Sequence, residues 1–213
     1  MENKWKQLDE KGWKRAVHIR SKAAKLFHKK GYLETSMGDI AASVRMSKGG
    51  VYHYFSSKDE ILFFVLNSYM DVLLKDLEQD LEEIEDRVEK IRFIIARHLR
   101  IFTTYPSESK TLFHEVHALP SKFFNLVAEK ERKYYQIIAD VLSEYFENRV
   151  ERHRLTGMTF VLLGMCNWTY SWYNPKGPLD PQELSNLIFN IFLNGLDSNN
   201  GGPDFNADRR EGK

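Results

Sequence analysis

The segment KGGVYHYF, from Lys48 to Phe55, gathers hydrogen-bond donors of a kind that could bind bases and phosphates. It offers a cation at Lys48, two tyrosine hydroxyls and the imidazole of His53. On a helix these groups would surround the apolar pair Val51 and Phe55, whose spacing puts both side chains on an inward face. The start of a helix also presents free backbone N–H groups, which favour phosphate oxygens. The pattern therefore favours a helix that meets DNA over a helical hairpin with a solvated face.

Two adjacent glycines at the start of this helix need a reason. Gly49 and Gly50 each cost roughly 1 kcal/mol of helix propensity relative to alanine. Close approach of the backbone to a groove wall would explain that cost. The glycines are thus a second indication that another molecule approaches this surface.

Three short helices would have to position the segment. Apolar residues recur three and four apart from Lys11 to Lys30, and Gly31 is suited to end that helix in a left-handed cap. Ser36 with Asp39 forms a capping-box pattern that begins a second helix, and Ser47 can cap the third. Two short helices held by a supporting helix are the arrangement of a helix-turn-helix.

Strand signals are weak throughout the chain, so the sequence predicts an all-α protein of about nine helices. Ser57 with Glu60 forms a second capping-box pattern, and Asp180 with Glu183 forms a third, in which Pro181 takes the first helical position. The later helices are expected over residues 57–81, 88–104, 110–119, 121–146, 151–173 and 180–195.

The net charge of +1 conceals two unequal parts of the chain. Residues 1–58 hold 13 Lys and Arg against 5 Asp and Glu, which gives +8, while the remaining 18 against 25 give −7. Concentrated cations suit a polyanionic partner. We therefore expect a helix-turn-helix DNA-binding domain over 1–58, a ligand-binding and dimerisation domain over 59–197, and a disordered polar tail over 198–213.

Cys166 is the single cysteine of the sequence, so no intrachain disulfide is expected, and a reducing cytoplasm is the expected location. The residues after Met1 are polar and do not resemble a secretory signal. Residues 155–173 carry no charged side chain over nearly the ~20 residues of a spanning helix. Their Thr, Asn and Ser content favours a helix buried on several sides, so no membrane partner is expected.

The run HEVH at residues 114–117 is the best candidate for metal binding or catalysis, with His98 and His153 elsewhere. Its spacing is not that of His-Glu-x-x-His, and the sequence has neither a nucleophile elbow nor a glycine-rich phosphate loop. We therefore predict no catalytic residue, no metal ligand, no cofactor and no enzyme. A helical-bundle metal-binding protein or enzyme is kept as an alternative.

The segment from Ala23 to Lys58, AAKLFHKKGYLETSMGDIAASVRMSKGGVYHYFSSK, resembles the N-terminal domain of the TetR family of bacterial transcription regulators. The resemblance implies a recognition helix in the major groove, with Val51 and Phe55 in the core beneath it. Carried over by position, it implies DNA contacts from Ser36, Lys48, Gly49, Tyr52, His53 and Lys58.

Arg45 departs from this family pattern, because many relatives have glycine in the turn. A non-glycine residue with positive φ costs about 1 kcal/mol or more. Either the turn relaxes, or Arg45 is tolerated because its guanidinium gains a phosphate contact. Arg45 is therefore a further candidate DNA contact.

The last two predicted helices could form a homodimer interface. Apolar side chains recur along residues 184–196, and Gly157 and Gly164 lie one heptad apart on the preceding helix. These residues could instead complete an intrachain core, although a dimer is favoured. A dimer would hold two recognition helices roughly 34 Å apart and predicts a palindromic operator in double-stranded DNA.

Aromatic residues concentrate between residues 102 and 173, where they could form a core or line an effector pocket. The Asn167 amide could orient a ligand in this apolar setting. The segment from Gly164 to Leu196 is similar to the C-terminal end of TetR-family regulators of fatty-acid and steroid breakdown, which respond to acyl-CoA thioesters. That resemblance implies an apolar acyl site with cations, Arg100 among them, for the CoA phosphates. The candidate ligand-binding residues are Arg97, Phe102, Phe113, Arg132, Asn167, Trp168 and Trp172.

The sequence as a whole predicts a homodimeric repressor that a small hydrophobic effector, such as an acyl-CoA thioester, releases from its operator. The ligand would act through the helix that begins at Lys58. Activation instead of repression stays open, as does a DNA-binding protein with no small-molecule effector.

Overall fold

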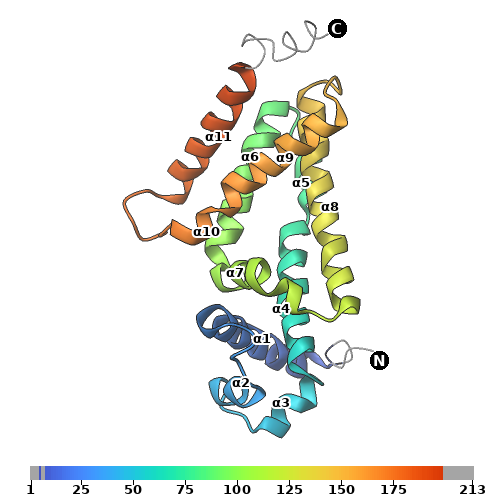
Figure 1. Cartoon of the computed structure of the whole chain (residues 1–213), viewed down its shortest axis with the longest axis vertical. Coiled ribbons are helices and arrows are strands. Elements are labelled where there is room, and N and C mark those ends of the chain that lie inside the picture. The colour runs from blue at the N-terminus through green and yellow to red at the C-terminus, as the bar shows by residue number, and fades with distance from the viewer. Residues whose placement is uncertain (1–4, 6–7, 199–213) are drawn as a thin grey trace, which may run out of the picture.

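The computed structural model describes residue 5 and residues 8–198, and all regular structure in those residues is helical (Figure 1). The predicted all-α fold is confirmed. The tail predicted over 198–213 lies outside the described residues, except for residue 198 at the end of the last helix.

Three helices form a small unit at one end of the molecule: α1 (Glu10–Lys30), α2 (Met37–Ser43) and α3 (Lys48–Tyr54) (Figure 1). Gly31 ends α1 with φ 86°, and its N–H donates to the Phe27 carbonyl at 2.8 Å. Its ψ of 158° is extended, so the positive φ was predicted correctly but the left-handed helical cap was not.

The predicted caps of α2 and α3 are confirmed. The Asp39 N–H donates to the Ser36 hydroxyl at 3.1 Å, and the Ser36 N–H donates to the Asp39 carboxylate at 2.7 Å, which completes the capping box. The Ser47 hydroxyl accepts from the Gly50 N–H at 3.0 Å. Because both caps are local hydrogen bonds, the sequence alone was sufficient to predict where these helices begin.

A single helix was predicted over 57–81, but the structure divides it into α4 (Lys58–Leu74) and α5 (Leu77–Glu82). Asp76 breaks it with φ 56°, although the segment contains neither glycine nor proline. The break frees the Lys75 carbonyl, which accepts a hydrogen bond from the Arg97 guanidinium. A contact from a distant residue thus accompanies the break, and no local pattern predicts it.

A larger bundle contains α6 (Arg87–Thr104), α7 (Pro106–Glu115), a 3₁₀ turn η2 (Val116–Ala118) and α8 (Ser121–Tyr145). Pro106 was expected only to end the preceding helix, but it also occupies the first position of α7. A missing N–H is harmless there, so α7 begins four residues before the predicted start at residue 110.

The C-terminal helices are α9 (Arg152–Asn167), the short α10 (Thr169–Trp172) and α11 (Pro181–Ser198). The helix predicted over 151–173 is therefore divided after Asn167. The predicted start of α11 is confirmed, since the Glu183 N–H donates to Asp180 at 2.9 Å and the Glu183 carboxylate accepts from the Asp180 N–H at 3.1 Å. No helix in the described part of the chain is long and apolar enough to cross a membrane.

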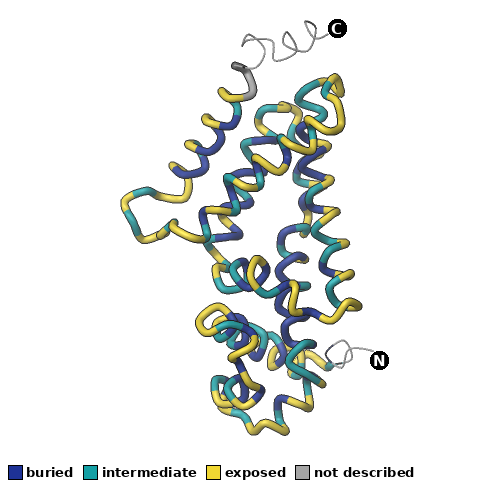
Figure 2. The backbone as a smooth tube through the Cα atoms, viewed as in Figure 1, coloured by how far each residue is buried: buried dark blue, intermediate teal, exposed yellow. Residues whose placement is uncertain are grey.

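Helix α4 runs from the small unit into the bundle and contributes to the core of both. Ten of its side chains are buried, and buried positions follow it along most of its length (Figure 2). Phe64 of α4 lies 5.5 Å from Phe55 of the small unit and stacks on Trp5 at 4.5 Å, both measured between ring centroids. The hydrophobic core therefore continues across the division predicted at residue 58. A shift of α4 would reach both parts of the molecule.

Candidate nucleic-acid interface and apolar cavity

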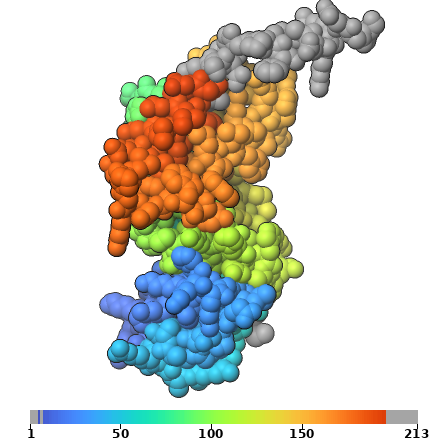
Figure 3. Space-filling model, turned by 60° about the vertical axis from the view of Figure 1, so that its left-hand side comes forward, coloured from blue at the N-terminus to red at the C-terminus, as the bar shows by residue number. Residues whose placement is uncertain are grey.

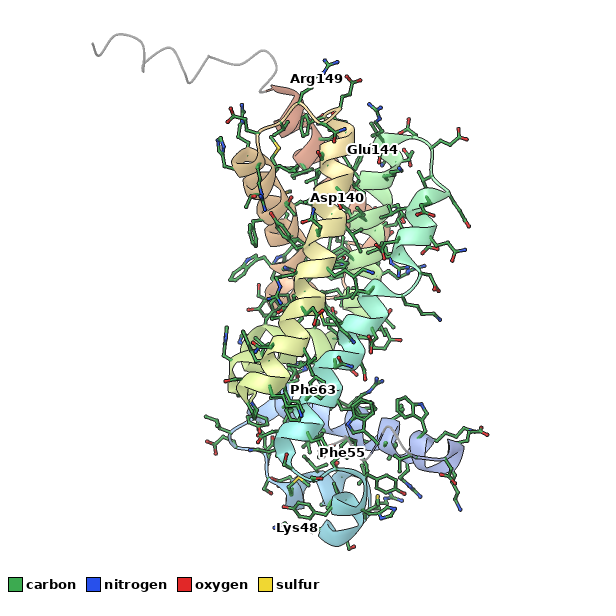
Figure 4. All side chains as sticks on the ribbon, turned by 90° about the vertical axis from the view of Figure 1, so that its right-hand side faces the viewer. Lys48, Phe55, Phe63, Asp140, Glu144 and Arg149 are labelled. Atoms are coloured by element: carbon green, nitrogen blue, oxygen red, sulfur yellow. The ribbon has the colours of Figure 1, made fainter. Side chains whose placement is uncertain are left out.

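The outer side of α3 has the character that the sequence predicted. Lys48, Gly49, Tyr52 and His53 are exposed, whereas Val51 and the adjoining Phe55 are fully buried. Figure 4 shows Lys48 at the outer end of the molecule and Phe55 between α3 and α4. The buried pair fixes α3 to its supporting helices, and the donors face outward.

The two glycines of α3 differ in their surroundings. A Cβ atom on Gly50 would lie 3.2 Å from the Met46 side chain and 3.3 Å from the Ser47 hydroxyl, so packing within the chain explains Gly50. A Cβ on Gly49 would meet only the Ser47 hydroxyl, at 3.9 Å. Packing within the chain therefore does not account for Gly49, and close approach of DNA is the explanation that is left for this glycine.

Ser36 is exposed, but its hydroxyl is already engaged in the capping box and donates to Asp39 at 2.7 Å. Lys30 adds an ion pair to the same carboxylate at 2.8 Å. The hydrogen bonds from Lys30 and Ser36 hold the pKa of Asp39 well below its usual range. A DNA phosphate can only accept a hydrogen bond, so a contact from Ser36 would have to turn its hydroxyl proton away from Asp39.

Arg45 adopts a left-handed backbone with φ 55°, so the turn does not relax to accommodate a side chain. The residue is exposed, and although its backbone N–H donates to the Ala42 carbonyl at 3.2 Å, its side chain forms no hydrogen bond or ion pair with any described residue. Of the two explanations left open by the sequence, the strained turn is thus real, and the guanidinium is available to a partner.

The Lys58 side chain forms bonds within the chain. Its ammonium donates to the carbonyls of Tyr32 at 2.8 Å and Leu33 at 3.2 Å, and it lies 4.2 Å from the centroid of the Tyr32 ring. The Tyr32 hydroxyl also donates to Asp59, and burial raises the pKa of this tyrosine. Lys58 therefore joins the start of α4 to the loop between α1 and α2.

Sequence reasoning assigned no role to the first half of α1, which lies beside the outer side of α3. Lys14, Arg15 and His18 share a cleft of about 430 Å³ with His53 and Tyr54. The signal was present in the charge count, which gave the first 58 residues a net +8, but a count does not say which cations adjoin α3.

The bundle contains an apolar cavity of about 640 Å³. Helices α4, α6, α7, α8 and α9 all contribute to its wall. This volume is typical of sites for small molecules. Its lining residues are Tyr69, Met70, Leu73, His98, Phe102, Leu112, Phe113, Glu131, Arg132, Tyr134, Tyr135, Thr156, Phe160, Leu163, Gly164 and Asn167.

Four of the seven predicted ligand-binding residues line this cavity: Phe102, Phe113, Arg132 and Asn167. Arg132 is the only one of the three arginines considered for CoA phosphates that does so. Glu131 stands next to it, and burial raises the pKa of that carboxyl, an effect that His117 and Arg132 oppose.

The other three predicted residues do not line the cavity. The Arg97 guanidinium pairs with Asp80 at 3.2 Å and borders a separate hollow of about 440 Å³ between α6 and α11, as does Arg100. Trp168 and Trp172 are 64% and 55% exposed on the outside of the bundle. Residue type alone placed these three in a ligand site, but the direction in which a side chain points depends on how the whole helix packs.

His98 and Tyr134 were missed as cavity residues. Both are buried, and His98 Nδ1 lies 2.8 Å from the Tyr134 hydroxyl. Burial lowers the pKa of His98 to about 4, which the nearby Asn167 partly opposes. The available signal was a histidine among the apolar residues of a predicted helix, Ile94, Ile95, Leu99 and Phe102.

The outer face of α9, α10 and α11 is unusually apolar. Figure 3 shows these helices side by side on one face of the molecule. A Cβ on Gly157 would meet nothing within 4 Å. Of the apolar side chains predicted along α11, Leu184, Ile188 and Phe192 are buried, so they pack within the chain. Large exposed apolar side chains on these helices are Val161, Trp168, Trp172, Leu187 and Ile191, together with Phe160, which also lines the cavity.

The described residues contain no group of three or more His, Cys, Asp or Glu side chains that could hold a metal ion. His114 and His117 instead lie against aromatic rings, those of Tyr170 at 5.4 Å and Phe124 at 5.8 Å. Cys166 is buried, which raises the pKa of its thiol to about 12.

Comparisons with known proteins agree with this geometry. Residues 19–64 match the family described as bacterial regulatory proteins, tetR family, and residues 85–196 match the one described as tetracyclin repressor-like, C-terminal domain. The chain belongs to the TetR family. It is a ligand-responsive, DNA-binding transcriptional regulator, as the sequence predicted, and it belongs to a family of regulators rather than enzymes.

Individual relatives resemble most of the chain. A TetR-family transcriptional regulator from Bordetella parapertussis is 30% identical, with a TM-score of 0.81 over 84% of this chain and 94% of its own. AibR, solved with isovaleryl coenzyme A and operator DNA, is 27% identical, with a TM-score of 0.75 over 83% and 97%. The transcriptional repressor KstR2 of Mycolicibacterium smegmatis is 26% identical over 84% of this chain and 89% of its own.

Proposed function

We propose that this regulator is a homodimeric repressor that leaves a palindromic operator when an acyl-CoA thioester enters the cavity among α4, α6, α7, α8 and α9. One observation carries the proposal. Tyr69, Met70 and Leu73 of α4 line the cavity, while Lys58 at the start of the same helix is bonded to the DNA-binding unit. A ligand that displaces α4 would therefore change how that unit is held.

An acyl chain suits the lining of the cavity, which is mostly apolar and aromatic. The resemblance to AibR, whose structure contains isovaleryl coenzyme A, supports this class of effector. Arg132 is the lining cation that would meet a CoA phosphate, and the exposed position of its side chain leaves room for a nucleotide outside the cavity.

A homodimer through α9 and α11 would cover the exposed apolar face described above. Phe160 and Val161 are 62% and 58% exposed, although monomeric proteins seldom leave large apolar patches in contact with water. The open space beside Gly157 would allow a second chain to approach closely.

The operator is double-stranded DNA, so we also propose a cytoplasmic location, where bacterial DNA lies.

At the DNA, we propose that Lys48, Tyr52 and His53 reach bases and phosphates in the major groove while Gly49 allows the backbone to come close. Ser36 and Arg45 would contact the phosphate backbone. Lys58 is exposed only in part, so its contact with a phosphate would be added to its bonds with Tyr32 and Leu33.

The test of this proposal first selects bound sequences from random DNA. The selected site is then titrated in the presence of acyl-CoA esters of about 4 to 18 carbons, a range that spans roughly the size of the cavity. Coupling of about 1 to 3 kcal/mol would weaken operator binding roughly 5- to 150-fold. An operator without two-fold symmetry, or an affinity that no ester changes, would contradict it.

A further inference from the structure

His98 leaves one ring nitrogen without a partner inside the cavity. Its side chain is 4% exposed and lines the cavity, yet Nε2 has no hydrogen-bond partner. The Asn167 side chain is close enough to raise the pKa of His98 against the effect of burial, but it forms no hydrogen bond of ordinary geometry with Nε2. Buried polar atoms are nearly always paired in folded proteins, so an unpaired one at the wall of a ligand cavity indicates a group that a ligand satisfies.

Tyr134 determines which tautomer this histidine adopts. The Tyr134 hydroxyl is buried, and His98 Nδ1, at 2.8 Å, is its only hydrogen-bond partner among the described residues. If Nδ1 carried the proton, the tyrosine O–H would be a buried donor without an acceptor, which costs about 1 to 3 kcal/mol. The tyrosine therefore donates to Nδ1, and the proton of the neutral imidazole lies on Nε2.

The ring is also held in position from both sides. Its centroid lies 5.7 Å from that of Phe102, nearly parallel at 20°, and 5.8 Å from that of Tyr134. A donor that is rigid, uncharged and surrounded by apolar groups suits an uncharged acceptor such as a carbonyl oxygen, because a charged acceptor would lose its hydration on entering.

We propose that the Nε2–H group of His98 is the polar anchor of the cavity and donates a hydrogen bond to the thioester carbonyl oxygen of the effector. This inference rests on the proposed acyl-CoA function and deepens it. Tyr134 acts as a positioning residue, because its hydroxyl fixes the tautomer of His98, although its ring is also part of the cavity wall. The acyl chain would extend from the anchor along the apolar wall that includes Met70, Leu73 and Phe102.

The test compares octanoyl-CoA with its thioether analogue S-octyl-CoA, which has a methylene group in place of the carbonyl. Calorimetric titration of the wild-type full chain is expected to show octanoyl-CoA binding about 10-fold more tightly, the change that loss of one buried hydrogen bond produces. The His98→Phe variant should bind both compounds equally, at the level of the thioether.

Two tyrosine variants supply a matched control that does not depend on how well His98→Phe folds. Tyr134→Phe removes the hydroxyl that fixes the tautomer and should reduce the preference for the carbonyl. Tyr135→Phe removes a hydroxyl from the same cavity but not from His98, and should leave the preference unchanged. Equal binding of both compounds to the wild type would overturn the anchor while leaving the acyl-CoA function intact. If neither compound binds and no ester of the wider series does, both proposals are wrong.

Discussion

Arg45 is the clearest case of a single residue at which function and stability compete. Its backbone is left-handed at φ 55°, a conformation that glycine adopts freely, and its exposed side chain forms no hydrogen bond or ion pair with a described residue. Strain of this kind is usually retained only where the side chain contributes something else. A phosphate contact is the contribution that its place in the turn before α3 suggests.

The variant Arg45→Gly should therefore stabilise the chain and weaken DNA binding together. We expect unfolding by urea to show a gain of about 1 kcal/mol, because glycine relieves the strain. The slope of log affinity against log salt should fall by about 0.9, the change for one lost phosphate contact. Arg45→Lys keeps both the charge and the strain, so it should change neither value. An unchanged salt slope in the glycine variant would show that the guanidinium does not contact phosphate.

Asp39 makes the start of α2 sensitive to acid. Its folded pKa is lowered by hydrogen bonds from Lys30 and Ser36, so its ionised form contributes stability at neutral pH. This contribution is complete above the ordinary carboxyl pKa of about 4 and is lost as the pH falls below it. The Asp39→Asn variant should therefore be less stable than the wild type by an amount that stays constant above about pH 5, roughly one unit above that pKa.

The difference in unfolding free energy between Asp39→Asn and the wild type should then shrink progressively below about pH 4. Urea titrations of both proteins across this range measure it. A double-mutant cycle with Lys30→Met separates the ion pair from the capping box at neutral pH. A difference that stayed constant into acid would mean that the Asp39 carboxylate is not involved.

At the scale of helices, the sequence predicts beginnings better than breaks. The starts of α2, α3 and α11 depend on side chains within three residues of each cap, and they lie where Ser36, Ser47 and Asp180 predict them. The breaks at Asp76 and after Asn167 have no glycine or proline to mark them. The break at Asp76 is accompanied by a hydrogen bond from the distant Arg97 to the Lys75 carbonyl, which local patterns do not describe.

The candidate sites also differ in how well the sequence predicts them. On α3, the side that faces outward follows from the buried pair Val51 and Phe55, so the exposed donors could be predicted. The cavity instead depends on the rotation of α6 and α9 about their axes. For this reason Phe102 and Asn167, two of the proposed ligand contacts, line the cavity, whereas Trp168, adjacent to Asn167, is exposed.

Helix α7 provides a second connection between the cavity and the DNA-binding unit, besides α4. Leu112 and Phe113 line the cavity, and two residues later the Glu115 carboxylate accepts a hydrogen bond from the Tyr32 N–H at 3.1 Å. At the other end of α7, the Ser107 hydroxyl lies 3.4 Å from the His28 ring. A ligand that moves Phe113 would therefore change both contacts, the one between Glu115 and Tyr32 and the one between Ser107 and His28.

Removing the Glu115 carboxylate should weaken communication without preventing either binding event. We expect Glu115→Ala to bind operator and effector separately as the wild type does, while the effector-induced loss of operator affinity falls by roughly 2- to 30-fold. Glu115→Gln retains an oxygen that can accept from Tyr32 and should behave as the wild type. Operator titrations with and without saturating effector measure the coupling. Full coupling in the alanine variant would leave α4 as the sole route.

For the whole molecule, the decisive property is that one chain carries one recognition helix at the end opposite Arg149 and Glu144 (Figure 4). A palindromic operator requires two such helices at a fixed separation of roughly 34 Å. The interface that sets this separation would then determine how many phosphates a single binding event engages. Dimerisation should thus be visible in the salt dependence of DNA binding and not only in the molecular mass.

The variant Val161→Glu tests this on the exposed side of α9. Val161 does not line the cavity, so the change should leave effector binding intact while putting an unpaired charge in the proposed interface. Sedimentation should show a monomer, and the slope of log operator affinity against log salt should fall to about half, because one unit releases half the counterions. Leu126→Glu, on α8 and 42% exposed, is the matched control and should remain a dimer. A Val161→Glu protein that stayed dimeric with an unchanged slope would move the interface away from α9, and with it the separation of the two recognition helices.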